Sequence, residues 1–160
     1  MKKRLGLIIV VVIAVLIVGL LVWRLWPQTA SSLIDAKENA GVTSCSAEFN
    51  STVNGLEIYR MDGQAADDVL EILESSGYRP DFRNLLPWGI DGVSSDRNHD
   101  GRTVRVFFGY EGDYADFLFL SRSLVVVTTA EKPGNRIYHP TNRETMDKLI
   151  TYLHTYGTEQ

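Results

Sequence analysis

One long apolar segment constrains this chain more than any other feature. Leu5–Trp23 is a run of nineteen residues without a charged or strongly polar side chain. At about 1.5 Å of rise per residue, a helix extended to Trp26 would cross a hydrocarbon core about 30 Å thick. Three basic side chains precede the run, and only Arg24 follows it closely. The sequence therefore predicts a single-pass transmembrane helix over residues 5–26, with residues 1–4 in the cytoplasm and the C-terminal domain outside it.

A cleaved signal peptide is the alternative interpretation of the same segment. Such a peptide usually has an apolar region of about 7–15 residues, followed by a cleavage site with small residues. Here the run is longer, and the best candidate site, Gln28-Thr29-Ala30, is a poor one. The retained helix is therefore preferred. Residues 27–43 are then expected to be a juxtamembrane tether, and residues 44–160 an extracytoplasmic domain.

The charges are distributed unevenly along the chain. It contains 16 basic and 20 acidic residues, and all of the acidic residues follow the apolar run. After residue 26 there are only 12 basic residues, so that part of the chain carries a net charge of -8. Proteins bind nucleic acid mainly through Lys and Arg contacts to phosphate, so nucleic acid is excluded as a partner. The expected partners are the membrane, contacted by the N-terminal helix, and a protein or an envelope ligand.

The alternation of apolar and polar residues predicts a mainly antiparallel sheet. Five segments have the composition of strands, and a sixth short one follows: Cys45–Val53, Leu56–Arg60, Arg102–Tyr110, Asp116–Leu120, Leu124–Thr129 and Arg136–His139. Asn54-Gly55 is the preferred pair for a two-residue hairpin turn, so the first two strands are expected to pair. The other connections at 111–113 and 133–135 are also short, which favours antiparallel neighbours.

Two amphipathic helices are expected to cover one face of this sheet. The first extends from about Gln64 to Ser76. The second has a capping-box pattern at its start, with Thr141 three residues before Glu144. Strands gathered into runs with two such helices predict an α+β domain of five to six strands with both helices packed on one face.

A turn-rich segment resembles the start of a calcium-binding loop. Asp96, Asn98 and Asp100 occupy alternate positions, and Gly101 follows them, so side-chain oxygens can converge on a hard cation. However, Phe107 stands where an EF-hand has its bidentate Glu, and a strand is predicted where a helix is needed. The alternative is a hairpin turn built from good turn-forming residues. Calcium is thus the one cofactor that the sequence suggests.

The connection from Tyr78 to Ser95 is the second candidate site. Long irregular loops in compact domains are often functional, and aromatic and Arg side chains dominate protein interfaces. The candidate partner-binding residues are Tyr78, Arg79, Phe82, Arg83 and Trp88. The alternative is a short helix over Pro80–Leu86 with a small satellite core. That core would consist of Phe82, Leu85, Leu86 and Trp88.

No catalytic motif is visible, and the three histidines, His99, His139 and His154, lack the spacing of a metal site. The leading hypothesis is therefore a non-enzymatic, membrane-anchored module that binds or senses an unknown ligand through the Tyr78–Ser95 region. Two alternatives remain open at this point: a small cell-envelope hydrolase and a calcium-stabilised structural domain. The sequence identifies neither the ligand nor a reaction.

Overall fold

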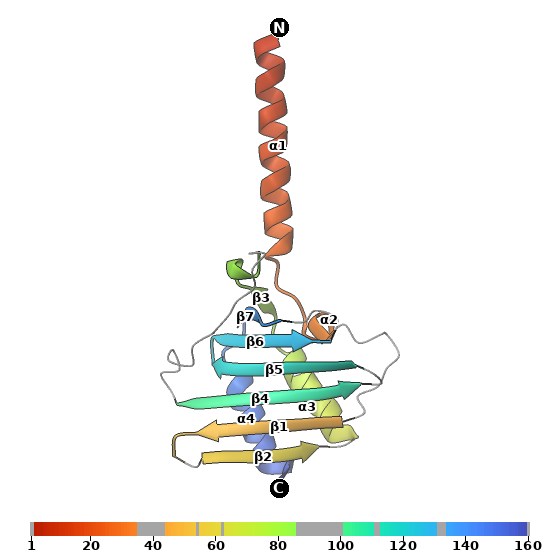
Figure 1. The fold of residues 1–160 in the computed structure, drawn as a ribbon, viewed down its shortest axis with the longest axis vertical. Helices are drawn as coiled ribbons and strands as arrows, with labels where there is room; N and C mark the ends of the chain where they lie inside the picture. Colours follow the sequence, from red (N-terminus) through yellow and green to blue (C-terminus); the bar gives the residue numbers. More distant parts are fainter. Residues whose placement is uncertain are drawn as a thin grey trace.

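The computed structural model describes residues 2–34, 44–53, 55–61, 63–85, 101–110, 113–130 and 134–159, with the side chains described from residue 8 onward. It contains one eight-stranded sheet with helices on one face (Figure 1). The strands are β1 Ser44–Ser51, β2 Gly55–Met61, β3 Tyr78–Pro80, β4 Arg102–Tyr110, β5 Asp113–Ser121, β6 Leu124–Thr129, β7 Arg136–Pro140 and β8 Thr158–Glu159. The helices are α1 Lys2–Arg24, α2 Ala30–Ile34, α3 Gln64–Glu74, the 3-10 helix η1 Phe82–Leu85 and α4 Thr145–Tyr156.

The predicted α+β character is confirmed, but the sheet has eight strands where five to six were expected. Its order is β3-β7-β6-β5-β4-β1-β2-β8, and each neighbouring pair is antiparallel. The two unpredicted strands, β3 and β8, are short and lie at the two edges. A segment of two or three residues is too short to show the alternation from which a strand is predicted.

The prediction of a transmembrane helix is wrong, and with it the assignment to a membrane as a single-pass protein with an extracytoplasmic domain. Among the residues that the structure describes, no helix combines the length and the apolar character needed to cross a membrane.

The main core lies between one face of the sheet and helices α3 and α4, which Figure 1 shows behind the strands. Alternate residues of each strand point into this core, as the pleat of a strand requires. In β4 the alternation places Val104, Val106 and Phe108 there, fully buried. Helix α3 contributes Ala66, Val69 and Leu73, and α4 contributes Met146, Leu149, Ile150 and Leu153. The opposite face has a small second cluster centred on Leu120, Val126 and Ile137.

The described residues that follow α1, 25–34, pack against the domain. In α2, Ala30, Leu33 and Ile34 are buried in the main core. Before α2, Gln28 forms an isolated antiparallel bridge with Tyr78 at the start of β3. Its two backbone hydrogen bonds, of 2.9 and 2.7 Å, connect the end of α1 to the β3 edge of the sheet. This connection brings the segment after α1 next to β3, β7 and η1.

The predicted hairpin is present, but its turn is longer than expected. Ser51 pairs with Gly55, so three residues separate the strands, and Val53 is 88% exposed in the turn instead of lying in the strand. Two contacts oppose the continuation of β1. The Val53 backbone N–H donates to Ser51 Oγ (3.1 Å), and the Thr52 N–H donates to the carbonyl of Gly101 (3.1 Å).

The start of α4 also differs from the prediction. The Thr141 hydroxyl accepts a hydrogen bond from the Gly77 N–H (2.9 Å), and it therefore does not cap the helix. The helix begins at Thr145, and Asn142 Oδ1 accepts the Glu144 N–H (3.0 Å) just before it. The distant Gly77 competes for the hydroxyl that a local pattern would assign to the cap.

Gly101 provides a test of the contact between the β1–β2 turn and β4. Its φ is +61°, and a Cβ added there would lie 2.7 Å from Thr52 Cγ2 and 2.9 Å from Thr52 Oγ1. Gly101→Ala should therefore lower the free energy of unfolding by about 2 kcal/mol, through left-handed strain and this clash. Chemical denaturation gives the value. In a Thr52→Ala background the loss should be smaller, and an equal loss in both backgrounds would show that the clash contributes nothing.

Candidate functional site

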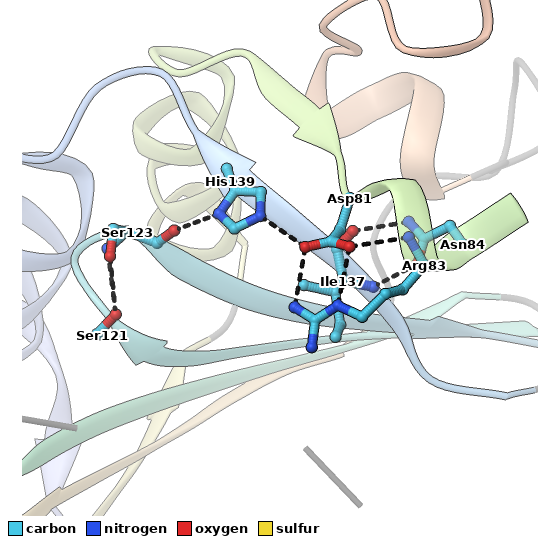
Figure 2. Close-up of polar contacts among 7 residues, drawn as sticks. All are labelled: Asp81, Arg83, Asn84, Ser121, Ser123, Ile137 and His139. Carbon is cyan, nitrogen blue, oxygen red and sulfur yellow. Dashed lines mark hydrogen bonds and ion pairs between the residues drawn. The ribbon is translucent and has the colours of Figure 1, made fainter. Parts of the chain in front are cut away.

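An ionic cluster lies at the junction of β3, η1 and β7, and Asp81 is its centre (Figure 2). The side chain of Asp81 is only 7% exposed. Arg83 donates to it from Nε (2.9 Å) and Nη2 (2.9 Å), and the Arg83 backbone N–H adds a third hydrogen bond (2.8 Å). These contacts with Arg83, together with one from His139, hold the pKa of the Asp81 carboxyl well below its usual range, against the opposing effect of burial.

His139 joins this cluster from β7. Its Nε2 lies 2.9 Å from Asp81 Oδ2, and its Nδ1 lies 2.9 Å from the backbone carbonyl of Ser123. A carbonyl oxygen only accepts hydrogen bonds, so Nδ1 must be the donor there. The ionised Asp81 carboxylate also accepts, so a ring protonated on both nitrogens satisfies both contacts. His139 therefore connects β7 with the β5–β6 turn and with Asp81, the residue between β3 and η1.

The cluster contains a serine, a histidine and an aspartate, but it lacks the geometry of a catalytic triad. His139 contacts Ser123 through the backbone oxygen, whereas the Ser123 hydroxyl lies 3.3 Å from that of Ser121 (Figure 2). Both ring nitrogens face acceptors, so neither is available to remove a proton from a hydroxyl. The histidine contacts support a structural role for this cluster and do not favour the hydrolase hypothesis.

Asn84 of η1 forms hydrogen bonds with the backbone of β7. Its side-chain Nδ2 donates to the Ile137 carbonyl (2.7 Å), and its Oδ1 accepts the Ile137 N–H (2.9 Å). One amide side chain thus pairs both backbone groups of Ile137, as a neighbouring strand would. The backbone N–H of Asp81 also donates to the Ile137 carbonyl (3.0 Å). These contacts fix η1 against the sheet.

Next to this cluster lies a cavity of about 400 Å³. It is enclosed by the end of α1 and the residues that follow it, by α2, by β3 and η1, and by β6 and β7. The deeper wall is apolar and includes Leu33, Val127 and Tyr138, which are 5%, 3% and 6% exposed. The mouth carries Trp23 and Trp26, which are 74% and 65% exposed. A concave apolar site with a few polar groups is typical of small-molecule binding.

Two arginines also line this cavity, Arg24 at the end of α1 and the half-buried Arg136 of β7. Within the described part of the chain, neither side chain takes part in a hydrogen bond or an ion pair. Among the described residues that line the cavity, Asp81 is the only carboxylate, and it is already bound by Arg83 and His139. Among the described residues, the two cationic groups of this cavity therefore have no anionic partner.

The predicted partner-binding residues do not form one surface, because they differ in burial and in their contacts. Tyr78 is fully buried, and its hydroxyl donates to the Leu73 carbonyl (3.0 Å); burial raises the pKa of this phenol. Arg79 is exposed on β3, Phe82 is 67% exposed on η1, and Arg83 is bound to Asp81. Trp88 lies outside the described residues. None of the four described residues lines the cavity, although their neighbours Pro80, Asp81, Asn84 and Leu85 do.

The short helix considered for this segment is present as η1, Phe82–Leu85. Its two large apolar side chains do not form a satellite core, because Phe82 is 67% and Leu85 is 41% exposed. The calcium candidates Asp96, Asn98 and Asp100, and also His99, lie outside the described residues. Within the described ranges, no three His, Cys, Asp or Glu side chains are grouped so that they could hold a metal ion. The calcium hypothesis therefore stays a prediction.

No sequence pattern indicated a binding role for the cavity residues of α1 or β7. Trp23, Arg24 and Trp26 belong to the apolar segment and its flank, and Arg136 and Tyr138 belong to a short strand. A dense group of two tryptophans and one arginine was the available signal at residues 23–26. No local pattern indicated that β7 would lie beside them.

Comparison of the chain with models of protein families, with curated proteins and with solved structures finds no match.

Proposed function

We propose that this protein is a non-enzymatic binding module, which takes a small ligand in the cavity between the end of α1, η1 and the β6–β7 part of the sheet. The observation that carries the proposal is the cavity itself. It has an apolar inner wall, aromatic side chains at its mouth and a volume of about 400 Å³, which suits a small organic molecule.

The surroundings of the cavity support a binding function, because its wall is held in place before any ligand arrives. The Gln28–Tyr78 bridge fixes the segment after α1, and Asn84 fixes η1 through both of its hydrogen bonds to Ile137. The Asp81–Arg83–His139 cluster adds ionic contacts on the same side. A site that is already ordered loses little conformational entropy on binding.

Blocking the mouth of the cavity tests this proposal. Ser32 is an exposed residue of α2 that lines the cavity, so Ser32→Phe places a ring there without changing the core. The probe is phenylnaphthylamine, an uncharged dye whose fluorescence rises in apolar surroundings. We expect Ser32→Phe to weaken dye binding at least tenfold, as measured by fluorescence titration.

Ser44→Phe is the matched control, because Ser44 is an exposed serine at the start of β1 and does not line the cavity. The apolar side chains of α1 are the same in every variant, so a difference between variants reports on the cavity. Binding that is equal in Ser32→Phe, Ser44→Phe and the unmodified chain would remove the cavity as the ligand site. Thermal unfolding without dye confirms that both variants fold.

A further inference from the structure

The two arginines that line the cavity indicate which class of ligand it takes. Arg24 and Arg136 come from α1 and β7, and the fold brings both to the wall of the same cavity. Guanidinium groups at a binding site usually form charge-assisted, bidentate hydrogen bonds with carboxylate, phosphate or sulfonate groups. Neither arginine has such a partner among the residues that the structure describes.

The wall of the cavity is divided by polarity in a way that suits an amphiphilic molecule. The inner part presents Leu33, Val127 and the ring of Tyr138, all of them buried. Arg24 is exposed at the mouth, and Arg136 is half-buried. An apolar body can therefore enter the deeper part while an anionic group stays with the arginines, where water still reaches it.

The only carboxylate on the described cavity wall does not neutralise these arginines. Asp81 accepts two side-chain hydrogen bonds from Arg83 and lies 2.9 Å from His139 Nε2. Its negative charge is matched by groups outside the cavity wall, because neither Arg83 nor His139 lines the cavity. Among the described wall residues, the uncompensated charge is therefore that of Arg24 and Arg136, and it is positive although the chain as a whole carries a charge of -4.

We propose that the cavity takes an organic anion, whose acidic group lies at Arg24 and Arg136 and whose apolar body fills the deeper part. This inference rests on the proposed binding function and adds the ligand class to it. The apolar body gains from leaving water, and the arginines select for the charge. A neutral molecule of the same shape should bind too, but more weakly.

A pair of dyes with one aromatic scaffold tests the inference. Anilinonaphthalenesulfonate is an anion, and phenylnaphthylamine is its uncharged counterpart without the sulfonate. In the full chain, Arg136→Gln should raise the Kd of the anionic dye about tenfold or more and change that of the neutral dye less than twofold. Arg136→Lys should retain part of the anionic preference, since it keeps the charge but not the planar fork.

Arg60→Gln is the matched control. Arg60 is an exposed residue of β2, close to the opposite edge of the sheet, and the substitution removes the same charge from the chain. It should leave both dyes unaffected, whereas Arg24→Gln combined with Arg136→Gln should make the two dyes bind equally well.

The outcomes separate the ligand class from the binding function. If Ser32→Phe abolishes binding of both dyes but Arg136→Gln leaves the anionic dye unaffected, the cavity binds ligands but the proposed class is wrong. If Arg136→Gln weakens both dyes equally, the arginine acts on the shape of the cavity and the class is again wrong. If inorganic phosphate, at matched ionic strength, displaces the anionic dye as well as an aromatic carboxylate does, the apolar body is not recognised. If Ser32→Phe changes neither dye, the proposed function itself fails.

Discussion

Replacing Asp81 by Asn should lower the free energy of unfolding by about 2–3 kcal/mol at neutral pH. The side chain of Asp81 is only 7% exposed. Its carboxylate accepts hydrogen bonds from Arg83 and lies 2.9 Å from His139 Nε2. In Asn, one carboxylate oxygen is replaced by an NH2 group, which is a donor and would face the donors of Arg83 and His139. Loss of one member of a buried ion pair costs about 3–5 kcal/mol, and the partial exposure of Arg83 and His139 to water reduces the loss here.

The loss caused by Asp81→Asn should also depend on pH. The Arg83 contacts lower the pKa of Asp81 in the folded state, whereas an unfolded Asp has a pKa of about 3.9. A carboxyl with a lowered folded pKa contributes stability above its unfolded pKa and loses it as the pH falls through the folded pKa. With His139 replaced by Gln in both proteins, the difference in stability caused by Asp81→Asn should therefore be constant above about pH 5 and decrease below about pH 4.

Two further variants make this measurement specific. Asp147→Asn breaks the Arg122–Asp147 pair, which is also bidentate but has side chains 48% and 41% exposed, so it should cost less than about 1 kcal/mol. The second comparison, of His139→Gln with the double variant His139→Gln, Asp81→Asn, measures the effect of the Asp81 carboxyl without the imidazole contact. Urea unfolding at several pH values gives each difference. An equal cost for Asp81→Asn and Asp147→Asn, or a difference that persists unchanged at pH 2, would contradict the role given to Asp81.

Local patterns in the sequence predicted the long elements well. The alternation in Arg102–Tyr110 matches β4 residue for residue, because each second side chain enters one continuous core. The apolar stripes likewise predicted α3 and α4. The short strands β3 and β8 were missed because they depend on backbone pairing with distant partners, β7 and β2. Such pairing leaves almost no trace in two or three residues.

Competition between distant groups explains the errors at the ends of elements. Thr141 and Glu144 have the local pattern of a capping box. However, the Thr141 hydroxyl accepts a hydrogen bond from the N–H of Gly77, which is 64 positions away in the sequence. A local pattern states what a side chain is able to do, and tertiary contacts decide among the possibilities.

The candidate site was not predictable from the sequence, since its residues meet only through the sheet topology. Asp81 and His139 are 58 positions apart and come together because β3 pairs with β7. Arg24 and Arg136 are farther apart still, and the Gln28–Tyr78 bridge is needed to bring the first toward the second. What the sequence did indicate was the segment after Tyr78, part of which forms the cavity wall.

Phe117→Ala should produce the largest loss of stability, about 3–5 kcal/mol. Phe117 lies at the centre of β5, is fully buried, and meets the rings of Tyr78 and Phe108 at centroid distances of 5.9 and 6.3 Å. The space left by the Ala substitution would be bounded by the sheet and by large side chains. These groups cannot close the space without breaking strand pairing. Equilibrium unfolding in urea, with the m-value unchanged, measures the loss.

Phe107→Ala is the matched control, because the two faces of one sheet differ in what covers them. Phe107 lies on the opposite face, is 39% exposed, and stacks on Tyr114 at a centroid distance of 5.8 Å. Its removal should cost about 1 kcal/mol, the usual contribution of a partly exposed aromatic pair. An equal loss for the two variants would mean that the Phe107 face is also packed in the folded protein. In that case the main core between the sheet and helices α3 and α4 would not be the chief source of stability among the described residues.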